Sequence, residues 1–412
     1  MRIVNFGSCN VDHVYKMEDH IVKVGETLSC CDLSFFEGGK GLNQSVAISR
    51  AGAKVYHAGC IGRDGQMLAD LLERSGVDIS YVQRVDASNG HAVIQVDPAG
   101  NNSIFIYPGT NGMIYEEYID RVLEDFCAGD ILLLQNETSN VKYIIDKAHE
   151  KGLSIVFNPS PFNEVISSID LNKVTYLMIN EVEGEALTGS DDPDRIISDL
   201  SEKYPKMRVI LTLGHRGAVY YDREHKIVQS AYSVLSVDST AAGDTFTGYF
   251  VAGIAGGKTV AEALRFASAA ASLSVSKLGA APSIPLAGEV KKALNWMVPI
   301  VFDAKEEQRK RINDYVDKSL RCVTLQDIAD HLKYSKNYTG ALIKRLMGMN
   351  YIEYLHSKRC ARAEELLKST DKSINDILSE IGYENGSFFR KKFKERYGSN
   401  PLEYRKQQQE DK

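Results

Sequence analysis

The segment from Asp238 to Asp244 carries residue types that a phosphoryl transfer needs. It reads Asp-Ser-Thr-Ala-Ala-Gly-Asp and leads from a strand-like run into a helical pattern. Small residues at a helix start, here Ala241, Ala242 and Gly243, leave backbone N–H groups free to receive charge that develops on a transferred phosphoryl group. Asp244 is placed to take the proton from an attacking hydroxyl. The alternative is an acidic side chain that only complements the helix dipole.

A glycine-rich segment, Glu37 to Gln44, precedes a helical run from Ser45 to Ala51. Adjacent glycines such as Gly39 let backbone amides approach a ligand closely, and Lys40 and Asn43 can hydrogen-bond hydroxyl groups. Taken alone, such a segment is more often a simple turn before a helix.

Asn10 and Asp12 follow the first predicted strand, and open α/β sheets bind ligands at the carboxyl ends of their strands. Together the two side chains could hold two hydroxyl groups of one sugar. A turn whose Asn and Asp bond to the local backbone is the alternative. Because the chain carries all three segments, a catalytic role is favoured for Asp244 over a purely structural one.

The elements that position these residues belong to an α/β domain. Up to about Leu294, short apolar runs such as 131–134, 154–157 and 209–212 alternate with longer helical patterns, which indicates a buried and largely parallel sheet. Thr27 to Phe36 and Gly90 to Tyr107 differ, because they contain strand patterns linked by turn residues. These two segments predict a small antiparallel flap.

Between Trp296 and Arg311 the chain changes character, passing Pro299 into a charged run from Asp303 to Glu307. Beyond this point the pattern is entirely helical. The predicted organisation is a domain over residues 1–298, a linker over 299–307 and an all-helical domain over 308–408.

The charge of the chain is unevenly distributed. Residues 1–302 carry 26 Lys and Arg against 37 Asp and Glu, whereas residues 303–412 carry 23 against 18, so the net charges are −11 and +5. Nucleic acid is therefore a plausible partner for the C-terminal part alone. Neither a secretory signal nor a run of 18 apolar residues is visible, and we expect a cytoplasmic protein without a membrane partner.

Seven cysteines are scattered along the chain without Cys-x-x-Cys spacing. This pattern argues against a disulfide framework and against a zinc site. We expect reduced thiols that mostly fill the core.

The C-terminal part repeats itself. Asp327-Ile328, Leu332 and Tyr334 recur at an offset of 49, while Tyr338, Ile343 and Lys344 recur at an offset of 50 as Phe388, Phe393 and Lys394. Two copies of a helix, a turn and a second helix fit this pattern.

The first 295 residues resemble the ribokinase-like carbohydrate kinase family. Gly38-Gly39-Lys40-Gly41-x-Asn43 and Asp238-x-x-Ala241-Ala242-Gly243-Asp244 stand where its two signatures stand, and the Ala-Ala-Gly-Asp of the second is similar to the ribokinase branch. The resemblance implies an ATP-dependent sugar kinase with a parallel-sheet sandwich, and a β lid that covers the sugar and pairs two subunits into a homodimer. Asp244 is then the base, and the amides of Ala241, Ala242 and Gly243 form the anion hole.

The resemblance also implies binding residues. The expected sugar ligands are Asn10, Asp12, Gly39, Lys40, Asn43 and Glu137. Asn180 and Glu183, in an Asn-x-x-Glu motif, would organise Mg²⁺ and the triphosphate through water, and the nucleotide loop would include Thr212, Gly214 and Gly217. A monovalent cation site, for K⁺, maps to Asp238, Thr240, Ser274, Gly279 and Ser283. Ser268 departs from the family pattern, which often has His near the adenine.

Residues 308–408 resemble the AraC-type DNA-binding domain, in which a long helix, here about Ile352 to Lys368, joins two helix-turn-helix units. The matching residues include Ile328-Ala329, Ser335, Arg359, Ala363, Leu366-Leu367, Gly382-Tyr383, Phe389, Phe393-Lys394, Gly398, Pro401 and Tyr404-Arg405.

Each second helix would enter the major groove of duplex DNA. The expected DNA contacts are Lys336, Asn337 and Lys344 in the first unit, and Asn385, Ser387, Arg390 and Lys391 in the second; for each, a solvated helix face is the alternative. Leu378 stands where a small residue is usual between the two helices of the second unit, so that unit is expected to be tilted or weakened.

Three functions fit these observations. The chain is an active sugar kinase that also binds DNA, a transcription regulator whose kinase fold only senses a sugar, or a kinase whose tail serves only for protein contacts. The intact Asp244 segment favours the first function. Ribose is the default substrate by resemblance, and deoxyribose, another pentose, a ketohexose or a nucleoside stays open.

Overall fold

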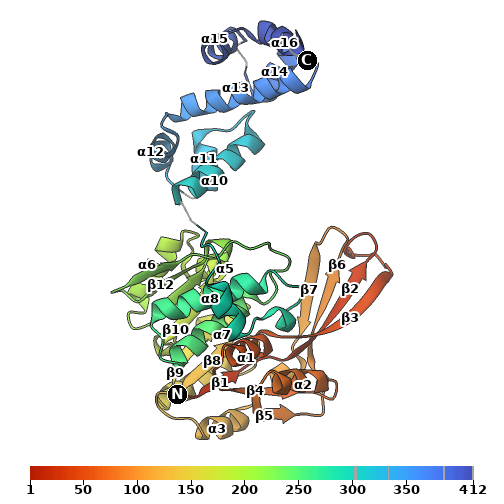
Figure 1. Cartoon of the computed structure of the whole chain (residues 1–412), viewed down its shortest axis with the longest axis vertical. Helices are drawn as coiled ribbons and strands as arrows, with labels where there is room; N and C mark the ends of the chain where they lie inside the picture. Colours follow the sequence, from red (N-terminus) through yellow and green to blue (C-terminus); the bar gives the residue numbers. More distant parts are fainter. Residues whose placement is uncertain (301–303, 333, 384–385, 411–412) are drawn as a thin grey trace. The chain divides into compact units, whose positions relative to one another are not determined.

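The computed structural model describes residues 1–300, 304–332, 334–383 and 386–410, and the chain forms two compact units (Figure 1). The first unit spans Met1–Val301 and the second spans Phe302–Lys412. The first is an α/β structure, and the described residues of the second are helical apart from short connections. The fold class expected from the sequence is therefore confirmed.

A nine-stranded sheet forms the centre of the first unit, in the order β13-β12-β11-β10-β9-β8-β1-β4-β5. Neighbouring strands from β11 to β5 are parallel, and β12 and β13 join antiparallel at one edge. The strands are β1 (Ile3–Phe6), β4 (Val55–Ile61), β5 (Asp78–Arg84), β8 (Ile131–Gln135), β9 (Ser154–Asn158), β10 (Tyr176–Asn180), β11 (Arg208–Thr212), β12 (Ala218–Tyr221) and β13 (Lys226–Gln229).

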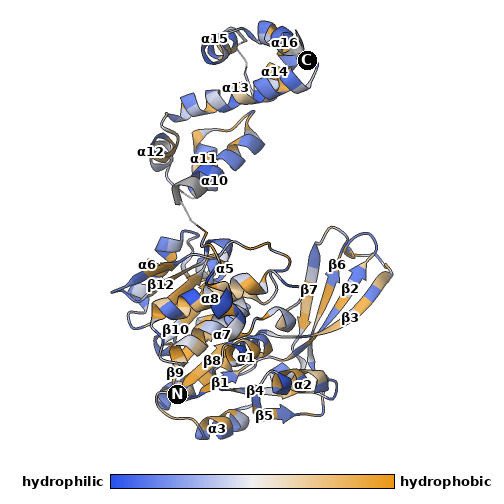
Figure 2. Ribbon diagram, in the orientation of Figure 1, coloured by the Kyte–Doolittle hydropathy of each residue, from blue (hydrophilic) through white to orange (hydrophobic). Residues whose placement is uncertain are grey.

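Helices cover both faces of this sheet, because successive residues of a strand point to opposite faces. Ile131 and Leu133 of β8 pack in one core with α1, α2, α7, α8 and α9, whereas Leu132 and Leu134 pack in another with α3, α4, α5 and α6. Figure 2 shows apolar residues concentrated in these central strands. The helices are α1 (Lys40–Arg50), α2 (Gln66–Arg74), α3 (Glu116–Glu124), α4 (Val141–Glu150), α5 (Glu181–Thr188), α6 (Pro193–Lys203), α7 (Ala242–Ala255), α8 (Val260–Ser274) and α9 (Ala287–Ala293).

A smaller sheet of four strands has the order β3-β2-β6-β7 and stands beside the large sheet (Figure 1). It consists of β2 (Asn10–Met17), β3 (Cys30–Gly38), β6 (Gly90–Val96) and β7 (Asn102–Tyr107). The two segments of the predicted flap form β3, β6 and β7, but the flap is not wholly antiparallel as predicted. It also contains β2, which carries Asn10 and Asp12 and pairs antiparallel with β3 but parallel with β6, so the sheet is mixed.

The small sheet exposes large apolar side chains that a globular surface usually buries. These are Leu33, Phe35, Phe36, Ile104, Phe105, Ile106 and Tyr107, each 41–58% exposed. They lie on β3 and β7, the two edge strands of this sheet.

The second unit contains two separate hydrophobic cores. One includes Ile328 and Ile343, the other includes Ile377 and Phe393, and α13 contributes residues to both. This is the arrangement of two helix-turn-helix units on one long helix. The helices are α10 (Ala304–Ser319), α11 (Leu325–His331), α12 (Lys336–Met347), α13 (Tyr351–Ser369), α14 (Ile374–Ile381), α15 (Gly386–Tyr397) and α16 (Pro401–Glu410).

All seven cysteines are free thiols, as expected, but the prediction that they mostly fill the core was wrong. Only Cys9, Cys60 and Cys360 are buried, whereas Cys30, Cys31, Cys127 and Cys322 are exposed. Position along the chain alone could not separate the two groups. Among the described helices, none is long and apolar enough to cross a membrane.

Candidate active site and DNA-binding unit

Asp244 lies in the first turn of α7, and two amide side chains from α1 hold its carboxylate. Asn43 Nδ2 donates to Oδ2 at 3.1 Å, and Gln44 Nε2 donates to Oδ1 at 2.9 Å. The two helices approach closely because Gly248 of α7 has no side chain; an added Cβ would lie 2.4 Å from the Cβ of Ala47. The carboxylate, 7% exposed, therefore has a fixed orientation.

Helix α1 begins at Lys40, earlier than the predicted start at Ser45. Gly39 makes the turn into the helix with a φ of 97°, which other residues rarely adopt. Gly41 packs on the backbone of the first strand's end, since an added Cβ would lie 2.3 Å from Gly7 Cα. Lys40 and Asn43 therefore project from the first turns of a helix rather than from a loop.

Glu137 and Asp12 bring two acidic groups to the amino end of α1. The Glu137 carboxylate accepts hydrogen bonds from the backbone N–H of Lys40 at 3.0 Å and from the hydroxyl of Ser8. Gly38 leaves the room that Asp12 occupies, because an added Cβ would lie 2.1 Å from Asp12 Oδ2. The sequence analysis had not identified Ser8, which carries no spacing signal.

Asp12, Glu137 and Lys40 have shifted pKa values because they are buried near other charged groups. Burial raises the pKa of Asp12 to about 7, and the negative charge of Glu137 adds to the shift. Burial also raises the pKa of Glu137, against the opposing charge of Lys40. Burial would lower the pKa of Lys40, but the carboxylates of Asp244, Glu137 and Glu183 outweigh it and the pKa is raised. Lys40 is therefore a cation among carboxylates.

Asn10 is buried, and its amide oxygen accepts a hydrogen bond from Asn111 Nδ2 at 2.7 Å. Asn111 Oδ1 in turn accepts from the backbone N–H of Cys9 at 3.0 Å. Asn111, which the sequence analysis missed, therefore sets the orientation of Asn10 from about a hundred residues away.

A small cavity of about 70 Å³ adjoins Asp244 and is also lined by Lys40, Asn180, Glu183 and Gly243. The Asn-x-x-Glu motif forms a capping box at the start of α5. Asn180 Oδ1 accepts from the backbone N–H of Glu183 at 2.9 Å, and Glu183 Oε2 accepts from the backbone N–H of Asn180 at 3.0 Å. The motif thus has a structural role and still presents a buried carboxylate to the cavity.

A larger cavity of about 400 Å³ shares Thr212 and Gly243 with the small one. Gly214 and Gly217 from the expected nucleotide loop line it, and so does Ser268. Gly217 must be glycine, since its φ is 104° and an added Cβ would lie 2.0 Å from a backbone oxygen. The volume and mixed lining suit a nucleotide base and ribose.

The amides at the start of α7 border both cavities. Ala241 adopts a left-handed conformation with a φ of 58° as the residue before the helix, which turns the chain sharply into α7. Ala242 lines the larger cavity, but its N–H donates to Ser239 O at 3.2 Å. Nothing lies within 4 Å of an added Cβ at Gly243, so the backbone there is open to a ligand.

The residues expected at a cation site lie in two loops that Asp238 ties together. Its carboxylate accepts from the N–H and hydroxyl of Thr240 at 2.9 and 2.6 Å, and from the N–H of Gly279 at 2.9 Å. The hydroxyls of Ser274 and Ser283 donate to backbone carbonyls of their own turns. Any cation there would therefore depend mainly on backbone carbonyls.

In the second unit, α12 and α15 are the second helices of the two helix-turn-helix units. Their expected DNA contacts Lys336, Asn337, Lys344, Ser387, Arg390 and Lys391 are all exposed, and Asn385 lies outside the described residues. In the described part of the chain, the four basic side chains of this set have no ion-pair partner. They are therefore available to phosphates or bases.

Leu378 packs in the second core, next to the start of α15, where the first residue is Gly386. An added Cβ at Gly386 would lie 3.2 Å from Leu378 Cδ1. In the first helix-turn-helix unit, the buried Ala329 stands at the position of Leu378 and Lys336 stands at that of Gly386. The larger residue of the pair is therefore on the second helix in the first helix-turn-helix unit and on the first helix in the second.

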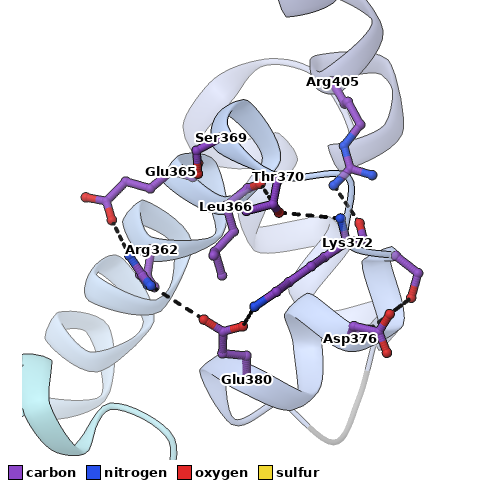
Figure 3. Close-up of polar contacts among 10 residues, drawn as sticks. Arg362, Glu365, Leu366, Ser369, Thr370, Lys372, Asp376, Glu380 and Arg405 are labelled. Carbon is purple, nitrogen blue, oxygen red and sulfur yellow. Dashed lines mark hydrogen bonds and ion pairs between the residues drawn. The ribbon is translucent and has the colours of Figure 1, made fainter.

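Polar contacts fix α14 against α13 and α16 (Figure 3). Glu380 of α14 accepts from Lys372 Nζ at 2.6 Å and from Arg362 of α13 at 3.5 Å, and Arg405 of α16 donates to Lys372 O at 2.7 Å. Contacts from α13, α16 and the segment before α14 therefore fix the position of the second helix-turn-helix unit on the long helix α13.

A carboxylate that two amide side chains hold at a helix start, beside a small cavity that shares residues with one of nucleotide size, is the arrangement of an ATP-dependent carbohydrate kinase. Comparison with known families agrees with this class. The chain belongs to the pfkB family of carbohydrate kinases, whose sequence model matches residues 1–287. A helix-turn-helix domain, of the AraC type, matches residues 328–407.

Relatives of the kinase part include ribokinases. The chain is 35% identical to the ribokinase of Haemophilus influenzae over 297 residues, which covers 70% of this chain and 96% of that protein. It is 32% identical to the deoxyribokinase of Salmonella typhimurium over 296 residues, with coverage of 69% and 96%.

Solved ribokinase structures have the same fold. The structure from Thermotoga maritima matches with a TM-score of 0.65 and 33% identity, over 72% of this chain and 99% of that chain. The ribokinase of Arabidopsis thaliana, complexed with ribose and ATP, matches with a TM-score of 0.64 and 30% identity, over 72% and 99%.

Proposed function

We propose that this chain transfers the γ-phosphoryl group of ATP to a hydroxyl of ribose or a closely related sugar, and that its C-terminal unit binds duplex DNA to regulate transcription. The main support for the proposed phosphoryl transfer is the contact of Asp244 with Asn43. Asn43 Oδ1 is buried and has no hydrogen-bond partner among the described residues. A sugar hydroxyl that donates to this oxygen would lie beside the carboxylate that takes its proton.

In the proposed reaction, the hydroxyl oxygen bonds to the γ-phosphorus, its proton passes to Asp244, and the bond to the β-phosphate oxygen breaks to release ADP. Free N–H groups among Ala241 to Gly243 and the cation of Lys40 stabilise the charge on the transferred group. Glu183 and Asn180 fit Mg²⁺ through water, because this ion prefers oxygen ligands and both the buried Glu183 carboxylate and the exposed Asn180 line the small cavity. Magnesium, when bound, neutralises charge on the triphosphate.

Ribose is the first candidate substrate, because Asn10, Asp12, Asn43 and Glu137 offer several acceptors for vicinal hydroxyls and because ribokinases are among the relatives. An ATP-turnover and thermal-shift screen over pentoses, hexoses and nucleosides tests this. We expect the highest kcat/KM with ribose. A nucleoside or hexose as best substrate would reject it, and a sugar-induced thermal shift without turnover would favour the sugar-sensing regulator instead.

A monovalent cation, K⁺, is proposed between the loops that Asp238 joins. The proposal rests on the carboxylate of Asp238, whose two oxygens accept hydrogen bonds from Thr240 and Gly279. Ser274 and Ser283 were the other residues expected at this site. Turnover should rise with K⁺ over a bulky organic cation at equal ionic strength. Equal rates in the two salts would remove this site.

The small sheet is proposed to pair two copies of the chain, since the apolar residues on β3 and β7 would then be buried. Phe105→Glu should shift the mass measured by light scattering from dimer to monomer. An unchanged mass, or a monomeric parent protein, would contradict the pairing.

The DNA-binding proposal rests on the exposed basic residues of α12 and α15. We propose specific sites near genes for uptake or use of the same sugar, with occupancy that depends on sugar or nucleotide. Genomic footprinting of the full chain with and without the sugar tests both parts. No enriched sites would reject DNA binding, and identical occupancy would reject the coupling.

A further inference from the structure

A chain of buried polar side chains begins at Asp244 and continues through residues that neither ligand cavity includes. Gln44 Oε1 accepts from Gln135 Nε2 at 2.7 Å, and the same Gln135 nitrogen donates to Asn5 Oδ1 at 3.0 Å. Asn5 Nδ2 donates to Ser45 Oγ at 2.8 Å, and Ser45 Oγ lies 2.8 Å from His57 Nδ1. This row of hydrogen-bonded side chains connects Asp244 to residues of β1, α1, β4 and β8.

These side chains are among the least exposed polar groups of the first unit. Gln44, Asn5, Ser45 and His57 are 0% exposed, and Gln135 is 1% exposed. Apolar residues could fill the same space without the cost of removing polar groups from water. A buried polar network holds one arrangement through the donors and acceptors that match, and here Gln135 Oε1 has no hydrogen-bond partner among the described residues.

The direction of every hydrogen bond in this chain follows from Asp244. An ionised carboxylate only accepts, so Gln44 must present its NH₂ group to Asp244 and its oxygen to Gln135. Gln135 must then donate to Asn5 Oδ1, which leaves the Asn5 NH₂ group to donate both to Ser45 Oγ and to the backbone oxygen of Gly41, each at 2.8 Å.

The far end of the chain completes this pattern. Ser45 Oγ accepts from Asn5 and lies 2.8 Å from His57 Nδ1, and the assignment that continues the pattern has the Ser45 hydroxyl donating to an unprotonated Nδ1. Burial lowers the pKa of His57 to about 4, against a smaller effect of the Gly7 backbone, so the ring is neutral near neutral pH. The ring proton is therefore on Nε2, the nitrogen that lies 3.2 Å from Cys9 Sγ.

We infer that Gln44, Gln135, Asn5, Ser45 and His57 are positioning residues that hold the carboxylate of Asp244 for proton abstraction. His57 supplies the last acceptor, which the buried Ser45 hydroxyl needs. Without that acceptor the Ser45 hydroxyl loses its partner, and a shift of Ser45 also moves Gln44, the preceding residue of α1, and with it the carboxylate of Asp244. This inference rests on the role proposed above for Asp244.

The test compares His57→Phe, which fills the space but removes the acceptor, with His57→Gln, which restores an acceptor. For His57→Phe we expect kcat to fall about ten- to a hundredfold, as for a misplaced catalytic group. The KM for ribose should stay within about twofold, because the sugar ligands are untouched. His57→Gln should recover most of kcat. Cys9→Ala is the matched control, since it removes only the contact at Nε2 and should leave kcat unchanged.

A second comparison asks whether the effect passes through the base. In an Asp244→Asn background, His57→Phe should cause no further loss of kcat. Normal kcat in His57→Phe, or an equal further loss in the Asp244→Asn background, would overturn the inference. If His57→Phe does not fold, Gln44→Met decides, because it keeps the side-chain length and removes the amide; normal kcat there overturns the inference too. Full activity of Asp244→Asn by itself would instead reject the proposed base.

Discussion

Asn43 Nδ2 and Asp244 Oδ2 lie 3.1 Å apart although 201 positions separate the two residues in the chain. The contact joins the two segments that the sequence showed separately, one rich in hydroxyl-binding groups and one at a helix start. It exists because Gly248 lets α7 pack against Ala47 of α1. The helix with the proposed sugar ligands and the helix with the proposed base are therefore held together in one arrangement.

Asp244→Asn should lower kcat by about a hundredfold or more, since a positioned general base typically contributes that much. Folding and sugar binding should be largely kept, because the substitution preserves shape. A coupled ATPase assay, with thermal unfolding and sugar titration as controls, measures this. Turnover close to that of the parent protein would remove Asp244 from the mechanism.

Asp12→Ala should raise the KM for the sugar strongly. Each lost charge-assisted hydrogen bond to a hydroxyl costs about 1.5–3 kcal/mol of binding free energy. Initial rates over a range of sugar concentrations give KM, and the KM for ATP serves as the control. If the sugar KM does not change, the sugar binds elsewhere.

The stability of the first unit should depend on the protonation of Asp12. Its pKa is raised from 3.8 to about 7 in the folded state, so the folded chain binds the proton more tightly than the unfolded chain does. Between these pH values the stability contributed by Asp12 therefore falls as the pH rises. Thermal unfolding across this range should show a steeper decline in the parent protein than in Asp12→Asn. Parallel curves would argue against a raised pKa.

Arg390→Ala should weaken binding to a specific DNA site by about 1–3 kcal/mol if the side chain reads a base. Affinity of the parent protein should also fall steeply with salt, because phosphate contacts release counterions. Lys368→Ala is a suitable control, since Lys368 is already paired with Glu364 at 2.6 Å. Equal effects of the two substitutions in a titration with footprinted DNA would mean that Arg390 has no special role.

Gly386→Ala should destabilise the second helix-turn-helix unit by no more than about 1 kcal/mol, the low end of the cost of overpacking, because Leu378 Cδ1 is the end of a flexible side chain and has to give by only a few tenths of an ångström. The added methyl group would lie 3.2 Å from Leu378 Cδ1. Leu378→Ala in the same chain should relieve this tight contact. The changes in the free energy of unfolding caused by the two substitutions should therefore be non-additive, as measured by denaturant unfolding. Additive effects would show that the two residues do not share this space.

Much of this protein could be predicted from its sequence. Strand and helix periodicity predicted an α/β part, the repeat in the C-terminal part predicted two helix-turn-helix units, and the resemblance of the two signature segments implied a carbohydrate kinase. The periodic features are local, because they depend on spacing along a single element. Tertiary structure alone decided that Asn10 and Asp12 lie on a strand, that Asn111 orients Asn10, and that Gly386 makes room for Leu378.

The buried chain from Asp244 to His57 shows the reason most clearly. Asn5, Gln135 and His57 lie in apolar strand patterns, where each reads as an isolated polar residue. Their hydrogen bonds cross from β1 to β8, α1 and β4, and no spacing within one element encodes a contact between elements far apart in the chain. The sequence therefore determined which elements form, and packing of the finished sheet against α1 and α7 decided which side chains meet at the base.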